Sequence, residues 1–244
     1  MLKSSVKNHN MNVKTHNWYI KKRVEETPGV FSLYLCSKNG KRPEFIAGQY
    51  VTIMLPYKIP EEGKAYSISS SPLDEDIRIT IRTMGDFSES ITRLDVGSEI
   101  ITTYPYGFFY PEIEETETIV FMSAGIGITP CMSIITNETM RKSKRTYYLF
   151  YSNQTIKDTV FYNEIESLKE KNQNLHVYYH ITREKALSDF FCQGRIDSQT
   201  AVDIVGDERA EYFLCGSMSF TKDMWKALRS VDVPEFQIYT EGFF

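Results

Sequence analysis

The segment Ser123–Pro130 reads Ser-Ala-Gly-Ile-Gly-Ile-Thr-Pro and joins an apolar run to a stretch with helical character. Gly125 and Gly127 let the backbone approach a ligand closely, because neither residue has a Cβ atom. Thr129 is suited to the N-cap of the helix and Pro130 to its first position. Free N–H groups at a helix start attract phosphate. The spacing therefore predicts a phosphate-binding turn, although close packing is an equally common reason for a Gly-x-Gly pair.

Polar or small residues follow each of the next three apolar runs in this half of the chain. If those runs are strands of one parallel sheet, their carboxyl ends meet at the edge where such sheets bind ligands. Each segment could be an ordinary turn, and Cys215 could be a small buried strand residue. Together they predict a nucleotide-binding crevice whose further members are Ser152, Asn153, Thr182, Arg183, Cys215, Gly216 and Met218.

Apolar runs alternate with helical segments from Thr118 onward. Strands are expected at Ile119–Met122, Tyr147–Tyr151, Val177–Ile181, Tyr212–Cys215 and Phe236–Tyr239. Helices are expected at Pro130–Met140, Thr159–Lys171 and Thr221–Val231. This alternation predicts an α/β unit with a parallel sheet and helices on both faces.

The preceding part of the chain has short apolar runs separated by turn signals such as Pro28-Gly29 and Asn39-Gly40. Strands are expected at Trp18–Val24, Val30–Cys36, Gln49–Leu55, Tyr66–Ser70, Ile77–Arg82 and Glu99–Thr103, with one helix at Ser88–Leu94. Six strands at this spacing predict an antiparallel Greek-key barrel. The expected fold class is therefore β followed by α/β, with a disordered polar tail at 1–16, a barrel domain at 17–112 and an α/β domain at 113–244.

Composition excludes several classes of protein. The 244 residues are 41% hydrophobic and 25% charged, as in ordinary globular chains, and the net charge of −4 gives no reason to expect nucleic-acid binding. No apolar run reaches the ~18 residues needed to span a bilayer, and the N-terminus lacks the apolar region of a secretory signal. The scattered cysteines Cys36, Cys131, Cys192 and Cys215 lack metal-ligand spacing, so we expect no metal and a soluble, cytoplasmic chain.

Five ordered motifs resemble those of the ferredoxin–NADP reductase superfamily, from about Trp18 to the C-terminus. One is the glycine turn followed later in the chain by Leu214-Cys215-Gly216. Lys64-Ala65-Tyr66-Ser67 is similar to that family's Arg-x-Tyr-Ser/Thr flavin signature, and Tyr104–Phe109 is similar to its Gly-Pro-x-Gly-x-Phe segment between domains. The remaining resemblance is to reductases of bacterial oxygenases, in Gly194–Asp197 and Tyr239–Phe243.

The resemblance implies that the barrel binds FAD, or less readily FMN. Tyr66 would then lie against the isoalloxazine ring, with Ser67 near the flavin N5. The backbone of Ile81 and Arg82 would line the polar edge of the ring. The flavin phosphate would be held at the start of the short helix by the backbone amides of Gly85, Phe87 and Ser88.

The resemblance also implies that the α/β domain binds NADPH or NADH. Thr129 and Cys215 would flank the nicotinamide, and Ser67 and Cys215 are the catalytic residues that this implies. Phe243 or Phe244 would cover the second face of the flavin. Arg183 is shaped to pair with a 2′-phosphate, which favours NADPH, although it could equally be a solvated loop charge.

Lys64 is a departure from the family pattern, which has arginine there. Lysine is a point charge and cannot bind phosphate through a planar fork. Arg82 is a second cation that could compensate. The choice between FAD and FMN therefore stays open at this point.

The expected function is hydride transfer from NAD(P)H to bound flavin, which then delivers electrons to ferredoxin, flavodoxin or an oxygenase component. The sequence has no ferredoxin-like cysteine cluster, so an iron–sulfur partner would be a separate protein. Two alternatives stay open: a reductase that releases free reduced flavin, and a non-catalytic nucleotide-binding subunit that regulates a partner.

Overall fold

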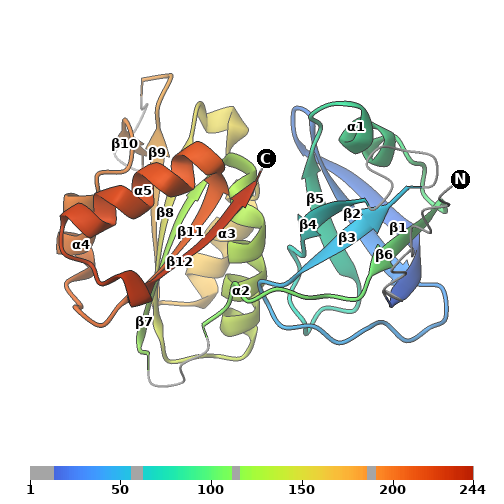
Figure 1. Ribbon diagram of the computed structural model, residues 1–244, viewed down its shortest axis with the longest axis horizontal. Helices are drawn as coiled ribbons and strands as arrows, with labels where there is room; N and C mark the ends of the chain where they lie inside the picture. The colour runs from blue at the N-terminus through green and yellow to red at the C-terminus, as the bar shows by residue number, and fades with distance from the viewer. Residues whose placement is uncertain (1–13, 56–62, 112–115, 186–190, 244) are drawn as a thin grey trace, which may run out of the picture.

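A computed structural model describes residues 14–55, 63–111, 116–185 and 191–243. Its first half is a six-stranded antiparallel sheet in the order β4-β3-β6-β1-β2-β5 (Figure 1). The strands are β1 (Thr15–Thr27), β2 (Val30–Ser37), β3 (Tyr50–Met54), β4 (Lys64–Ser67), β5 (Ile77–Arg82) and β6 (Glu99–Thr103). A bridge between Ile68 and Ile79 joins the edge strands, so the sheet closes into the predicted barrel.

The barrel core consists of the inward-facing residues of these strands, among them Trp18, Leu33, Ile53 and Ile79. Helix α1 (Asp86–Thr92) follows β5 and buries Phe87 and Ile91 against that core. Alternation along the strands explains why the barrel was predictable, because every second residue must face the core.

The boundaries of two barrel elements differ from those expected. β1 begins at Thr15, so Thr15 and His16 are paired with Thr103 and Thr102 of β6 rather than lying in a disordered tail. Helix α1 begins at Asp86, because Gly85 at φ +84° turns the chain into the helix ahead of Ser88. Residues 1–13 of the expected tail lie outside the described residues, and so do residues 112 and 113 at the expected domain junction.

The second half is a parallel sheet in the order β10-β9-β8-β7-β11-β12. Its strands are β7 (Thr118–Ala124), β8 (Thr146–Asn153), β9 (Leu175–Ile181), β10 (Phe191–Gln193), β11 (Glu211–Ser217) and β12 (Ile238–Phe243). β7 is nearly all apolar because both of its faces are covered. None of the described helices has the length and apolar character required to cross a membrane.

Helices cover both faces of this sheet, as predicted. Helices α2 (Ile128–Met140) and α3 (Tyr162–Lys171) cover one face, and α2 lies on the side toward the barrel (Figure 1). Helices α4 (Ser198–Val205) and α5 (Met218–Ser230) cover the other face. Short 3₁₀ turns at Gly125–Gly127, Ile156–Asp158 and Glu235–Gln237 precede α2, α3 and β12.

Two elements of this half were not expected, β10 and α4. β10 has only three residues, too few for an alternating pattern to be detected. Helix α4 is short, and its start is recognisable only from Asp197, whose carboxylate accepts the backbone N–H of Thr200 at 2.8 Å.

The predicted N-cap of α2 was wrong. Gly127 caps the helix, and Thr129 is its second residue, with its hydroxyl donating to the carbonyl of Ile126 at 3.0 Å. The reason is the Gly125–Gly127 turn, which continues directly into the helix and so moves the helix start forward. Pro130 still lies in the first turn, where its missing N–H is tolerated.

Candidate functional site

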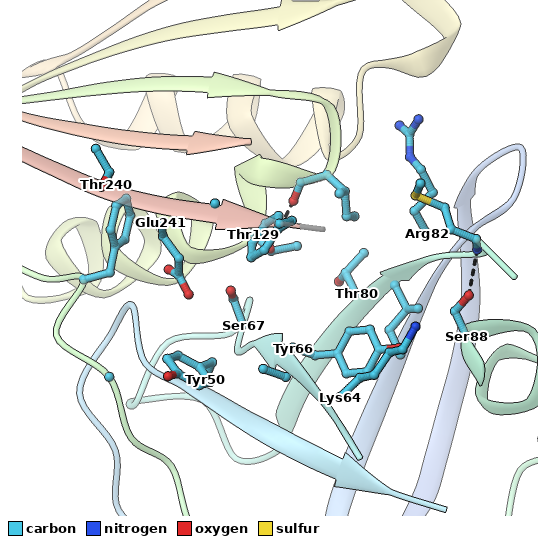
Figure 2. A pocket seen from close by; sticks show the side chains of 18 of the residues that line it. Tyr50, Lys64, Tyr66, Ser67, Thr80, Arg82, Ser88, Thr129, Thr240 and Glu241 are labelled. Atoms are coloured by element: carbon cyan, nitrogen blue, oxygen red, sulfur yellow. Dashed lines mark hydrogen bonds between the residues drawn. The ribbon is translucent and has the colours of Figure 1, made fainter. Parts of the chain in front are cut away.

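A cavity of about 910 Å³ lies where the barrel meets the parallel sheet (Figure 2). Residues of both halves line it. The barrel supplies Tyr50, Lys64, Ala65, Tyr66, Ser67, Thr80, Ile81, Arg82, Met84 and Ser88. The connector, which is the segment between β6 and β7, supplies Gly107, Phe108 and Phe109. The α/β half supplies Ile126, Thr129 and the whole of β12. The structure thus brings together most of the predicted flavin-binding residues with Thr129 and Phe243.

Strand β4 directs Tyr66 into the cavity, as Figure 2 shows. Its ring packs on the barrel core, and burial raises the pKa of its phenol to about 12. Tyr66 is therefore neutral at physiological pH and presents a flat, largely apolar surface. Lys64, two residues earlier, holds its ammonium 5.7 Å from the ring centroid of the buried Phe87.

The end of β5 carries Arg82 across to the other half. A Cβ atom added at Gly125 would lie only 3.5 Å from Nη2 of Arg82, so this barrel cation sits beside the glycine turn. Its Nε is buried and has no hydrogen-bond partner among the described residues. Nearby, Ser88 Oγ accepts the backbone N–H of Met84 at 2.6 Å and donates to the carbonyl of Gly85 at 3.0 Å.

Glu241 on β12 was missed by sequence reasoning. Its side chain lies opposite Ser67 in Figure 2. It belongs to the reductase-like segment Tyr239–Phe243, but its carboxyl group was not among the predicted site residues. Burial raises its pKa to about 7, and the neighbouring Ser67 opposes that rise. Within the described part of the chain, neither Ser67 Oγ nor Glu241 Oε2 has a hydrogen-bond partner, although both are buried. Only the pairing of β12 with β11 places this carboxyl at the cavity.

Several predicted residues of the α/β half do not line the cavity. Cys215 is completely buried, which raises the pKa of its thiol, and its carbonyl lies under Gly127. A Cβ atom on Gly127 would come within 2.2 Å of that carbonyl oxygen, so this glycine serves close packing. Gly216 is likewise packed, in this case against the ring of Phe220.

The strand ends of this sheet do meet at one edge, as predicted. Ser152 and Asn153 end β8, and both amide atoms of Asn153 are buried without a partner among the residues described. Thr182 and Arg183 follow β9 and line a separate, open depression with Glu184, Lys185 and Gln193. Met218 begins α5 and is half exposed. Within the described ranges, no group of three His, Cys, Asp or Glu side chains could hold a metal ion.

Comparison with known proteins shows which domain family and which fold this chain resembles. Residues 121–226 match the family model of the oxidoreductase NAD-binding domain. The FAD/NAD-binding domain of a nitric oxide dioxygenase from Vibrio cholerae has the same fold, with a TM-score of 0.82 at 24% identity over 93% of this chain and 98% of that one. A ferredoxin NADP+ reductase from Neisseria gonorrhoeae matches with a TM-score of 0.78 at 20% identity, over 95% and 99% of the two chains.

The chain therefore shares the fold of the ferredoxin–NADP reductases and carries, over residues 121–226, the pattern of an oxidoreductase NAD-binding domain. This confirms the resemblance and the fold class expected from the sequence. Among curated proteins, a flavohemoprotein of Bacillus subtilis is 28% identical over 233 residues, which are 92% of this chain and 58% of that protein. A flavohemoprotein of Bacillus cereus is also 28% identical, over 93% of this chain and 60% of that protein. The chain therefore spans well under two thirds of the length of these relatives.

Proposed function

We propose that this chain oxidises NAD(P)H with a bound flavin, FAD, and passes the electrons to a separate carrier. The observation that carries the proposal is the cavity between the two sheets, which brings the flavin-signature residues of β4 to Thr129 and β12. The fold supports it, and the Neisseria reductase of the same fold is described with bound FAD and NADP. The NAD-binding family model over residues 121–226 supports the nucleotide half.

The side chains around the cavity fit a flavin. A flavin needs a flat apolar contact for its ring, hydrogen-bonding groups for its polar edge, and positive charge for its phosphate. Tyr66 offers the first, the unpartnered Ser67 Oγ and Arg82 Nε offer the second, and Lys64 offers the third. Gly85, Phe87 and Ser88 would add backbone N–H groups toward the phosphate. When bound, the flavin accepts hydride and releases single electrons.

Ser67 and Glu241 would bind and release a proton at the side of the cavity that faces β12. A carboxyl group with a pKa of about 7 is partly protonated at neutral pH, so it can both hold and give up a proton. Ser67 lies beside it and can pass that proton through its hydroxyl. We therefore add Glu241 to the predicted catalytic residue Ser67.

The nucleotide would enter from the carboxyl edge of the parallel sheet. Thr129 and Phe243 line the shared cavity, Gly125 and Gly127 form the turn beside it, and the β8 and β9 strand ends extend the surface outward. Gly216 and Met218 would border the nucleotide at the start of α5. Cys215 remains a proposed neighbour of the nicotinamide, and its side chain is completely buried in this structure.

The decisive experiment is an absorbance spectrum of the purified protein, with cofactor extraction and mass analysis, followed by anaerobic titration with NADPH and NADH. The proposal expects a yellow protein that contains FAD and is bleached by the nucleotide. Turnover is then measured with ferredoxin, flavodoxin, an oxygenase component and a haem protein as acceptors. A colourless protein that reduces added flavin would instead be a flavin reductase. Absence of any activity with ferricyanide would leave a nucleotide-binding regulatory subunit.

A further inference from the structure

Arg78 is a buried cation of the barrel whose contacts lie mostly outside the barrel strand that carries it. It is on β5, and its side chain is only 6% exposed. Its guanidinium meets the Glu164 carboxylate of helix α3 at two points, with Nη1 to Oε2 at 2.7 Å and Nη2 to Oε1 at 3.1 Å. Two parallel N–H···O bonds fix orientation as well as distance. This ion pair therefore joins the barrel to the α/β half with a defined geometry.

The same guanidinium lies over an aromatic ring of the α/β half. Its central carbon is 4.4 Å from the ring centroid of Phe161, the residue that precedes α3. Phe161 has φ +63° and ψ +19°, a left-handed conformation that a bulky residue adopts only when its surroundings hold it there. Arg78 thus contacts both the first turn of α3 and the strained residue that starts it.

Arg78 also binds the segment that follows strand β4. Its Nε donates to Ser69 Oγ at 3.1 Å and its Nη2 to the Ser69 carbonyl at 2.7 Å. Ser69 is two residues beyond Ser67, whose hydroxyl faces Glu241. A single side chain therefore connects the flavin-signature strand to helix α3.

Neighbouring bonds continue this connection to the nucleotide side of the cavity. Ser133 Oγ on α2 donates to the Ser70 carbonyl at 2.6 Å, and Ser71 Oγ donates to Asn137 Oδ1 at 3.3 Å. The first turn of helix α2 lies beside the cavity, which Thr129 lines. Residues 69–71 are consequently bonded on one side to Arg78 and on the other to α2, and α2 in turn packs on α3.

We infer that Arg78, Glu164 and Phe161 form an interdomain clamp that sets the distance between the flavin side of the cavity, at Tyr66 and Ser67, and the nicotinamide side, at Thr129. These three are positioning residues, because none of them lines the cavity. The kinetic consequence rests on the proposed function, whereas the geometric consequence does not. Without the Glu164 charge, the two halves sample a wider range of separations and the reacting groups are aligned less often.

The chain offers two natural reporters for the geometric consequence. Cys36 lies on β2 of the barrel and Cys192 on β10 of the parallel sheet, and both are partly exposed, whereas Cys131 and Cys215 are buried. Spin labels on Cys36 and Cys192 of the full-length protein report the separation of the halves by pulsed dipolar spectroscopy. Glu164→Gln removes the charge at a position that is 36% exposed, and Glu170→Gln makes the same change on the solvent-exposed side of the same helix.

Glu164→Gln should broaden the distance distribution, while Glu170→Gln should reproduce that of the wild type. In the flavin-loaded protein, Glu164→Gln should slow flavin reduction at saturating nucleotide by roughly ten- to a hundredfold, with flavin content and KM little changed, because small misplacements of reacting groups cost rate rather than affinity. Arg78→Lys, which keeps the charge but loses the bidentate pair, should give an intermediate effect.

Equal distance distributions and equal reduction rates in the Glu164→Gln and Glu170→Gln variants would overturn the clamp. A wild-type protein that is not reduced by either nucleotide would overturn the proposed function, and the distance measurement would still decide the clamp.

Discussion

Glu241 is a carboxyl group held next to Ser67 in the cavity between the two halves. Removing it from water disfavours its charged form, which is why its pKa rises from the ordinary value of 4.5 to about 7. Because the folded protein binds this proton more tightly than the unfolded chain, the associated stability is complete below pH 4.5 and is lost as the pH rises toward and through 7. At higher pH the native state carries a buried, weakly compensated charge.

We expect the Glu241→Gln variant to lose this pH dependence. Over the window from pH 5 to pH 8, the free energy of unfolding of the wild type should fall, relative to the variant, by on the order of 3 kcal/mol. Urea unfolding at both pH values measures this, and Glu170→Gln, an exposed carboxyl, serves as the control. Parallel pH profiles for the wild type and Glu241→Gln would mean that the carboxyl is not held protonated.

Arg183 is the second residue whose role depends on its surroundings. It follows β9 and lines an open depression with Thr182 and Lys185, where a phosphate could be reached by two cations and a hydroxyl. Glu184 shares this depression, but its carboxylate accepts the backbone N–H of Ile156 and is turned to that bond. We propose that this depression receives the 2′-phosphate of NADPH in preference to the 2′-hydroxyl of NADH.

Arg183→Ala should lower kcat/KM for NADPH by roughly ten- to a hundredfold and leave that for NADH nearly unchanged, because a charged hydrogen bond contributes about 1.5–3 kcal/mol. Steady-state rates with both nucleotides measure the ratio. Arg209→Ala, at an arginine whose side chain is 84% exposed before β11, is the matched control. An unchanged preference would remove Arg183 from nucleotide selection.

At the scale of elements, the turn before α2 uses its two glycines for different reasons. Gly125 has φ +53° and open space around its missing Cβ, apart from Arg82 at 3.5 Å. Gly127 has ordinary helical angles, but its missing Cβ would fall 2.2 Å from the carbonyl oxygen of Cys215. Conformation requires the first glycine, whereas contact with β11 requires the second.

Alanine substitutions should separate these two reasons. Gly125→Ala should cost about 1 kcal/mol of stability, the strain of a left-handed alanine. Gly127→Ala should cost about 3 kcal/mol, because α2 and β11 must move apart to admit a methyl group against backbone. Urea unfolding of both variants tests this, and equal costs would show that the turn relaxes as a unit.

At the scale of the whole molecule, the two halves are joined by buried polar bonds as well as apolar contacts. Ser133 Oγ donates to the Ser70 carbonyl at 2.6 Å and accepts the N–H of Gly48 at 3.4 Å. Phe109 of the connector packs on Phe213 of β11, with ring centroids 5.2 Å apart. The interface between the two halves therefore contains directional hydrogen bonds. Such bonds resist sliding of one half over the other better than apolar contact alone.

Ser133→Ala should destabilise the protein by about 1–3 kcal/mol, because it leaves a buried carbonyl and N–H without their partner. Calorimetry should show a lower midpoint, and the two halves should unfold less cooperatively. Ser230→Ala, at an exposed helix serine that bonds only the Ala227 carbonyl in the described structure, should change stability by less than about 0.5 kcal/mol. Similar effects of the two changes would argue that the hydrogen bonds between the halves add nothing to the cooperativity of unfolding.

Sequence alone was enough for the features that depend on local periodicity. Alternation along the first half and the change to a βα pattern after Thr118 predicted the barrel and the parallel sheet. The glycine turn, the Lys64–Ser67 signature and the strand-end residues were recognised because each is contiguous in the chain. Boundaries were less accurate, as Thr129 and the start of β1 show, since a helix or strand end depends on a few cap and pairing contacts.

Only the tertiary structure decided how residues far apart in sequence act on one another. The raised pKa of Glu241, the burial of Cys215 and the pairing of Arg78 with Glu164 each depend on strands and helices that meet after folding. Burial and charge pairing are properties of an environment and not of a residue type, so no local pattern contains them. The turn at Gly125–Gly127 joins both kinds of information: its sequence predicted a bend, and the position of Cys215 beneath Gly127 explained why the second glycine is needed.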